Sequence, residues 1–177
     1  MADRPELRKA LFLDRDGVIN EDTGYPHRSE HIVFRPGIFE FCRAAVAKDY
    51  LIVVVTNQAG VAKGKFTEDD VRALHAWMGE EFRRKGVEIA GFYYCPYHRE
   101  ALLPEYRQDS PMRKPRPGMI LQAARELGID TGRSIMVGDK PSDRIQLPGL
   151  RSIIVRSGYA SEGYDVERLS DVERYLG

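Results

Sequence analysis

Short apolar runs alternate with amphipathic segments of helical period along this chain. The runs are rich in β-branched and aromatic residues and fall at residues 10–13, 51–55, 92–94, 134–137 and 152–155. The run 51–55 is Leu-Ile-Val-Val-Val, as expected of a strand buried on both faces. Strands that alternate with helices indicate a parallel sheet covered on both sides. The sequence therefore predicts a three-layer α/β/α fold.

The segments between the runs carry helix signals. One helix is expected after Pro36-Gly37, and another from Thr67, whose partner Asp70 completes a capping box, to Gly86. A third runs from Pro117-Gly118 through Leu127. A terminal helix is expected over 166–176. Within the second helix, a row of apolar side chains predicts core packing, and His75 is interpreted as an ordinary residue of that helix.

Length and charge limit the class of protein. A chain of 177 residues is the size of one domain, so we expect a single domain over 1–177. Lys+Arg and Asp+Glu are 27 each, and such a balance attracts neither nucleic acid nor an anionic membrane. With two cysteines and no apolar stretch of membrane-spanning length, we expect a soluble, cytoplasmic monomer that acts on a small molecule.

Polar residues directly follow several of the apolar runs. They are Asp14, Asp16, Thr56, Asn57, Asp139 and Lys140. Because ligands of open parallel sheets bind beyond the carboxyl ends of the strands, these residues are expected to meet at one edge of the sheet. Any one of them alone is as well explained by a turn or a helix N-cap.

These residue types suit phosphate-monoester hydrolysis. One carboxylate can attack phosphorus while a second acts as acid and base, which fits the spacing of Asp14 and Asp16. Asp139 can complete an oxygen-rich Mg²⁺ site. Thr56 and a lysine can hold the phosphoryl oxygens. The pattern therefore predicts a magnesium-dependent phosphatase.

Several segments carry a family resemblance. Residues 13–17, 55–58, 113–115 and 138–140 with Asp143 resemble, in order, the motifs of haloacid-dehalogenase-like (HAD-like) phosphatases. More narrowly, residues 14–20, 24–25, 53–60, 64–67, 93–96, 113–119 and 137–140 resemble the D-glycero-D-manno-heptose-1,7-bisphosphate 7-phosphatases. The likeness spans about residues 10 to 158. It implies a HAD-like Rossmannoid sheet without a large cap domain.

The resemblance also implies roles for matching residues. Asp14 would be the nucleophile and Asp16 the general acid/base, with Thr56 and Lys114 stabilising the transferring phosphoryl group. Mg²⁺ would be held by Asp14, the backbone carbonyl of Asp16, and Asp139. The substrate would contact Asp22, Thr23, Gly24, Tyr25, Asn57, Gln58, Ala59, Arg113 and Lys140.

The chain departs from the family pattern in its long loop. Relatives carry a zinc loop of the form Cys-x-His and Cys-x-Cys, whereas the matching positions here are Cys95, Tyr97, Ser110 and Met112. A structural zinc site needs a full set of ligands, so we expect no bound zinc. We expect the loop to be held instead by Leu102, Leu103, Tyr106 and its prolines.

A second departure from the family pattern follows Asp143. Pro148-Gly149 is expected to end the next helix early, so that little helix covers the neighbouring edge of the sheet. The catalytic carboxylates come before this segment, so activity is expected to survive.

The function implied by the resemblance is removal of the 7-phosphate of D-glycero-D-manno-heptose 1,7-bisphosphate, a step toward nucleotide-activated heptose for lipopolysaccharide, capsule or a glycoprotein. Histidinol-phosphate phosphatases share similar motifs and remain an alternative. A polynucleotide phosphatase is disfavoured by the zero net charge. From another class, a non-catalytic sugar-phosphate binder also remains open. Turnover of phosphomonoesters with Mg²⁺ separates an enzyme from a binder.

Overall fold

Five parallel strands form one sheet in the computed structural model, which describes residues 5–177. The strands are β1 (Ala10–Leu13), β2 (Leu51–Asn57), β3 (Ile89–Cys95), β4 (Ile135–Gly138) and β5 (Arg151–Ile154), in the spatial order β3-β2-β1-β4-β5. The central strand β1 is buried at every residue. The predicted parallel sheet is confirmed, and β2 and β3 extend beyond the predicted runs.

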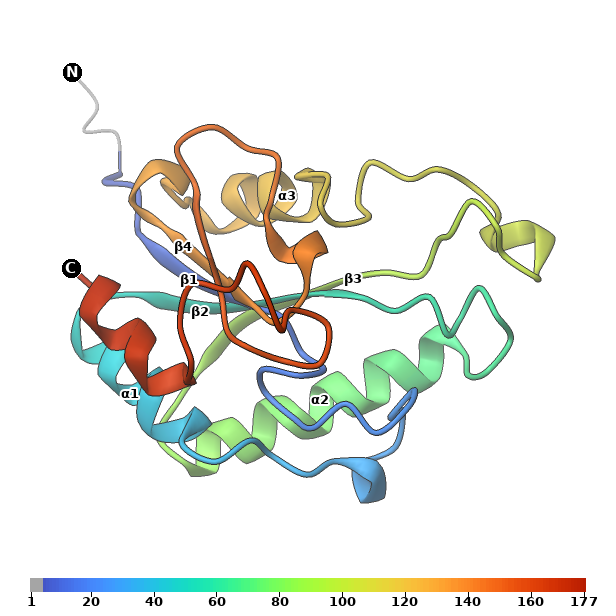
Figure 1. Cartoon of the computed structure of the whole chain (residues 1–177), viewed down its shortest axis with the longest axis horizontal. Coiled ribbons are helices and arrows are strands. Elements are labelled where there is room, and N and C mark those ends of the chain that lie inside the picture. The colour runs from blue at the N-terminus through green and yellow to red at the C-terminus, as the bar shows by residue number, and fades with distance from the viewer. Residues whose placement is uncertain (1–4) are drawn as a thin grey trace.

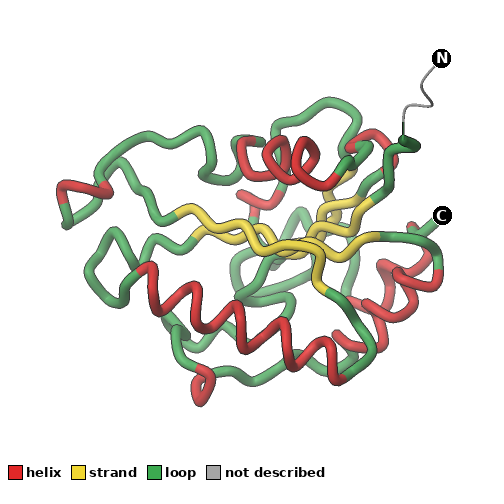
Figure 2. Tube along the Cα trace, turned by 180° about the vertical axis from the view of Figure 1, so that it is seen from behind, coloured by secondary structure: helices red, strands yellow, loops and turns green. Residues whose placement is uncertain are grey.

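Helices cover both faces of the sheet (Figure 1). On one face lie α1 (Ile38–Ala47), α2 (Glu68–Arg84) and the C-terminal 3-10 helix, Leu169–Tyr175. On the other lies α3 (Gly118–Leu127). Seen from behind, the strands run through the middle with helices above and below (Figure 2). The three-layer expectation is therefore confirmed, and within residues 5–177 no insertion forms a large cap.

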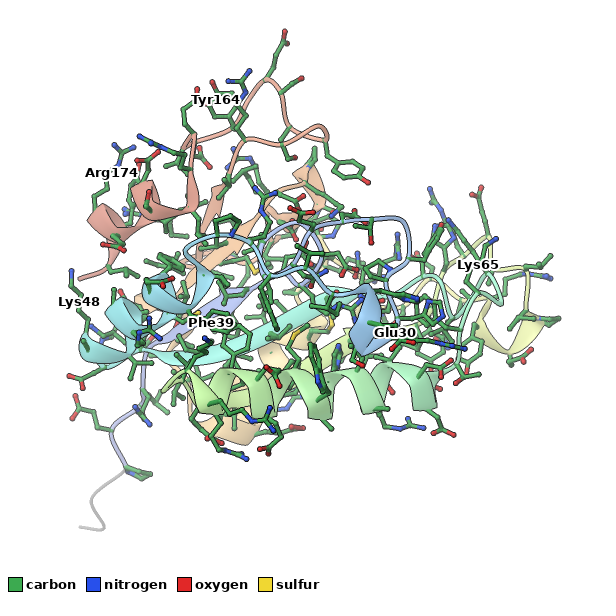
Figure 3. All side chains as sticks on the ribbon, turned by 90° about the horizontal axis from the view of Figure 1, so that it is seen from below. Glu30, Phe39, Lys48, Lys65, Tyr164 and Arg174 are labelled. Carbon is green, nitrogen blue, oxygen red and sulfur yellow. The ribbon has the colours of Figure 1, made fainter. Side chains whose placement is uncertain are left out.

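Each face of the sheet has its own apolar core, because side chains alternate along a strand. Leu11 and Leu13 of β1 pack toward α1 and α2, whereas Ala10 and Phe12 pack toward α3. Phe39 of α1 contributes to an aromatic cluster between α1 and α2 (Figure 3). The predicted capping box is present, since Thr67 Oγ1 accepts from the Asp70 amide at 3.1 Å.

Two expectations about helices need correction. The expected terminal helix is present but is a 3-10 helix over Leu169–Tyr175, shorter than 166–176, because Val166 first extends the chain as a bridge partner of Val155. Between β4 and β5 there is no shortened α-helix but a single 3-10 turn, Pro141–Asp143. Ile145 and Leu150 cover that part of the sheet with their side chains.

The loop after β3 is also ordered differently from the expectation. Leu102 does not hold it, because its side chain is 72% exposed. The Leu103 amide bonds the Ala62 carbonyl at 3.1 Å, which joins this loop to the one that follows β2, and the two extend side by side in Figure 1. Tyr106 packs on a small cluster around Phe66, as expected. In the described part of the chain, no helix is both long and apolar enough to span a bilayer.

Candidate active site

The strand register brings the predicted site residues together. Leu13 at the end of β1 pairs with Val54 of β2 on one side and Val137 of β4 on the other. Asp14 therefore leaves the sheet within one residue of the level of Thr56 and Asp139, although they are far apart in sequence. This is the convergence that a parallel sheet predicts for its carboxyl ends.

The site lies in a cleft of about 470 Å³ at this edge. Most of the expected residues line it: Asp14, Asp16, Asp22, Gly24, Tyr25, Thr56, Asn57, Gln58, Ala59, Arg113, Lys114 and Lys140. Asp139 is buried beside it and contacts Lys140. Thr23 is exposed and does not line the cleft.

A buried lysine lies at the floor of the cleft. Lys114 Nζ donates to Asp14 Oδ1 at 3.0 Å and to Asp143 Oδ1 at 2.6 Å, and all three side chains are nearly inaccessible to solvent. Burial acts to lower the pKa of Lys114, but the two carboxylates outweigh it and raise that pKa. Asn57 fixes the lysine backbone, since its amide group bonds both the Lys114 amide and carbonyl. The ammonium is therefore charged and held in place.

Lys140 lies at the centre of a ring of oxygen atoms. Its Nζ is 3.1 Å from Asp139 Oδ1, 3.2 Å from the Asp16 carbonyl oxygen and 3.6 Å from Asp14 Oδ2. These carboxylates, above all Asp14, raise the pKa of Lys140 against the opposing effect of its burial. These are the oxygens that are expected to bind Mg²⁺. The Lys140 ammonium therefore lies among the expected metal ligands.

Asp139 is packed tightly against the turn after β1. Burial, and then the charge of Asp14, raise the pKa of its carboxyl to about 7, while Lys140 acts in the opposite sense. Its close neighbour is Gly17, which has a positive φ of 97°. A Cβ at Gly17 would lie 2.0 Å from Asp139 Oδ2, so the approach of this carboxylate requires glycine.

Asp16 and Thr56 present their polar groups beside Asp14. The Asp16 carboxylate accepts hydrogen bonds from Arg15, Asn20 and Gln58. Thr56 Oγ1 accepts from Gln58 Nε2 at 2.9 Å. Its hydroxyl donates only a long hydrogen bond, of 3.5 Å, to the Asn57 carbonyl, so a closer acceptor in the cleft can take that proton.

Some residues of the cleft were given no role by sequence reasoning. Lys63, Tyr159 and Asp143 also line it. Lys63 Nζ donates to the Tyr25 hydroxyl at 2.6 Å, and the Tyr159 hydroxyl donates to Asp22 at 3.1 Å. Asp143 belongs to a recognised motif and carried the only signal of these three. Lys63 and Tyr159 lie on loops, where no periodic pattern of apolar residues indicates which way a side chain points.

A parallel sheet with acidic strand ends and a buried lysine beside the first of them is the arrangement of the HAD-like hydrolases. The HAD-hydrolase-like family model matches residues 111–172. A Burkholderia mallei protein named D-glycero-alpha-D-manno-heptose-1,7-bisphosphate 7-phosphatase is 51% identical over 135 residues, covering 76% of this chain and 71% of the relative. The corresponding beta-named enzyme of Pasteurella multocida is 44% identical, covering 86% and 84% of the two chains.

A solved structure agrees with these relatives. D,D-heptose 1,7-bisphosphate phosphatase from B. bronchiseptica, in complex with magnesium and phosphate, has a TM-score of 0.79 and 28% identity. The match covers 95% of this chain and 97% of that one. The chain belongs to the family of D-glycero-D-manno-heptose-1,7-bisphosphate 7-phosphatases.

Proposed function

We propose that this chain is a Mg²⁺-dependent phosphatase that removes the 7-phosphate of D-glycero-D-manno-heptose 1,7-bisphosphate through an aspartyl-phosphate on Asp14. Its family membership supports this proposal. The observation that carries it is the position of the Asp14 carboxylate, buried at the floor of the cleft with ammonium groups of Lys114 and Lys140 beside it. The two ammonium groups hold this carboxylate at the floor of the cleft, where it would attack a bound phosphoryl group.

The reaction would proceed in two balanced steps. In the first, an Asp14 oxygen bonds to phosphorus, the bond from phosphorus to the sugar oxygen breaks, and Asp16 gives that oxygen a proton. In the second, Asp16 takes a proton from a water molecule whose oxygen attacks phosphorus, which releases phosphate and restores the Asp14 carboxylate. Lys114 and the Thr56 hydroxyl would contact the phosphoryl oxygens during both steps.

The donor set around Lys140 fits Mg²⁺. Asp14, Asp139 and the Asp16 carbonyl offer hard oxygen ligands, and carboxylate oxygens of Asp14, Asp139 and Asp143 lie within 4.8 Å of one another. Asp143 is committed to Lys114 and to backbone amides, so we assign the ion to Asp14, Asp139 and the Asp16 carbonyl. When bound, Mg²⁺ offsets the negative charge of the transferring phosphoryl group.

The second phosphate of the substrate would bind at the basic rim. Arg113 Nη1 is buried and has no hydrogen-bond partner among the described residues. Burial lowers the pKa of the Arg113 guanidinium, yet an arginine stays charged at neutral pH. An unpaired buried donor favours an anionic ligand. Lys63 adds a second positive charge to the lining of the same cleft.

One set of assays tests this proposal. Phosphate release with Mg²⁺ would be compared for the α and β anomers of the heptose bisphosphate and for histidinol phosphate, with the variant Asp14→Asn as control. We expect hydrolysis of a heptose bisphosphate, heptose 1-phosphate as product, and a loss of at least ~10⁴-fold in the variant. Preference for histidinol phosphate would overturn the heptose assignment. Full activity of Asp14→Asn would overturn the mechanism.

A further inference from the structure

Arg15 lies between the two reactive aspartates in the sequence and is almost completely buried, with 1% of its surface exposed. Its Nε is 2.9 Å from Asp16 Oδ1 and its Nη2 is 3.2 Å from Asp16 Oδ2, a two-pronged contact with the carboxylate. Nη2 also donates to the Pro26 carbonyl at 2.8 Å and lies 3.3 Å from Gln58 Oε1. A buried guanidinium needs such partners, because an unsatisfied charge in the interior is costly.

The remaining nitrogen of Arg15 meets a histidine of α2. Nη1 lies 3.2 Å from His75 Nε2. Arginine only donates hydrogen bonds, so Nε2 must be the acceptor and the proton of the neutral ring must be on Nδ1. Burial, and next the charge of Arg15, lower the pKa of His75 to about 3, in agreement with a neutral ring. His75 is therefore not the ordinary helix residue that the sequence predicts.

The position of the His75 ring is fixed by its surroundings. It stacks on Phe92 of β3 with ring centroids 4.7 Å apart and planes inclined by 19°. The ring is 5% exposed. A continuous set of contacts thus runs from the core between α2 and β3, through the guanidinium, to the Asp16 carboxylate. Because both ends of Arg15 are held, its orientation is determined.

We propose that His75 is a positioning residue for the reaction: as a neutral acceptor it fixes the guanidinium of Arg15, which holds Asp16 in the orientation needed for proton transfer to the leaving oxygen. This inference rests on the proposed phosphatase function and goes beyond it. Without the acceptor, Arg15 Nη1 would be left buried and unpaired, and the guanidinium would shift to find another partner. Asp16 would shift with it.

Two substitutions separate this role from simple packing. His75→Leu keeps an apolar side chain of moderate size but removes the acceptor, whereas His75→Gln keeps an acceptor atom near the position of Nε2. Each would be assayed on p-nitrophenyl phosphate, whose phenolate departs readily without a proton, and on the alkyl phosphate that the wild-type protein hydrolyses fastest. The value kcat/KM reports the step in which the leaving group departs, where Asp16 acts as an acid.

We expect His75→Leu to lower kcat/KM for the alkyl phosphate by at least ~10-fold and to lower it far less for p-nitrophenyl phosphate. His75→Gln should restore most of the lost activity. Equal losses on both substrates, or a glutamine variant as poor as the leucine variant, would overturn the proposal, since disturbed packing predicts those results.

A measurement on the wild-type protein keeps the test decisive if the leucine variant does not fold. Nitrogen NMR at neutral pH should show His75 with a bare Nε2 and a protonated Nδ1, and a protonated Nε2 would overturn the proposal. The proposed function is tested separately, because a wild-type protein active on other alkyl phosphates contradicts only the heptose assignment. A wild-type protein without any phosphomonoesterase activity contradicts both.

Discussion

Lys114 Nζ lies 2.6 Å from Asp143 and 3.0 Å from Asp14, so one buried ammonium joins the carboxylate that follows β1 to one that follows β4. Asp143 is entirely buried. Its second oxygen accepts from the backbone amides of Asp139 and Lys140, both at 3.1 Å. Asp143 therefore holds the lysine and the turn after β4 at the same time.

The first prediction concerns Asp143→Asn. The side-chain amide would turn a donor toward either the ammonium or the backbone amides, which leaves a buried charge without its partner. We expect unfolding free energy to fall by about 3–5 kcal/mol in urea titrations, with a drop in kcat. Asp109→Asn is the matched control, because Asp109 is 73% exposed and its pairing with Arg116 should contribute less than ~1 kcal/mol. Equal stability of the two variants would contradict this account of Asp143.

The second prediction concerns Gly17→Ala. The new methyl group would displace Asp139, so we expect Mg²⁺ affinity measured by calorimetry to fall at least ~10-fold. The control is Gly128→Ala, which has a positive φ of 67° but no atom within 4 Å of its Cβ. It should cost about 1 kcal/mol of stability through backbone strain and leave Mg²⁺ binding unchanged. If both variants bind Mg²⁺ normally, Asp139 is not a ligand.

The sequence predicts the position of the site better than it predicts the connections around it. Asp14, Thr56 and Asp139 meet because strand ends in a parallel sheet must meet, and that rule needs no knowledge of side-chain packing. The exposed Leu102 shows the opposite case, since nothing in a loop without period indicates which apolar side chain turns inward.

The contact that His75 of α2 makes with Arg15 could not be predicted from the sequence, for a different reason. His75 lies on the buried side of a helix, as its spacing predicts, and most such residues only pack. Its partner Arg15 is distant in sequence and reaches it from the turn after β1. Spacing along one element cannot reveal a hydrogen bond between two elements. The same limit applies to Tyr159 and Asp22, which meet from loops at opposite ends of the chain.

The third prediction is that the protein holds no structural zinc. Cys95 is a buried thiol whose pKa is raised by burial, and it has Ser110 as a hydrogen-bond neighbour. Elemental analysis should find no stoichiometric zinc, and a strong zinc chelator should leave the thermal midpoint unchanged. A full set of ligands is needed for a stable tetrahedral site. Stoichiometric zinc in the purified wild-type protein would contradict the prediction.

A variant that restores the zinc ligands complements the zinc analysis of the wild-type protein. Tyr97→His, Ser110→Cys and Met112→Cys together would recreate the relatives' pattern around Cys95. Because Cys95 and Ser110 already contact each other, we expect the triple variant to bind zinc and to gain thermal stability from it. A triple variant without zinc would mean that the loop has lost the geometry of the site as well as its ligands.

The fourth prediction is a pH-dependent loss of stability that originates at His75. Its pKa is about 3 in the folded chain, against 6.5 for the free side chain. Above pH 6.5 the ring is neutral in both states and contributes nothing to the pH dependence. Between pH 6.5 and 3 only the unfolded chain binds the proton, so the unfolding free energy falls as the pH falls, by about 1.4 kcal/mol per pH unit.

From pH 7 to pH 5 the loss is therefore about 2 kcal/mol, a value set by the unfolded pKa because the buried ring stays neutral throughout. The charged groups nearest the ring are Arg15, which opposes its protonation, and Asp16, which favours it. Urea unfolding of the wild-type protein and of His75→Gln at both pH values isolates this contribution, since all other titrating groups are common to the two proteins. Parallel pH dependences would mean that His75 gains its proton while the chain is folded, and the neutral acceptor beside Arg15 would then be wrong.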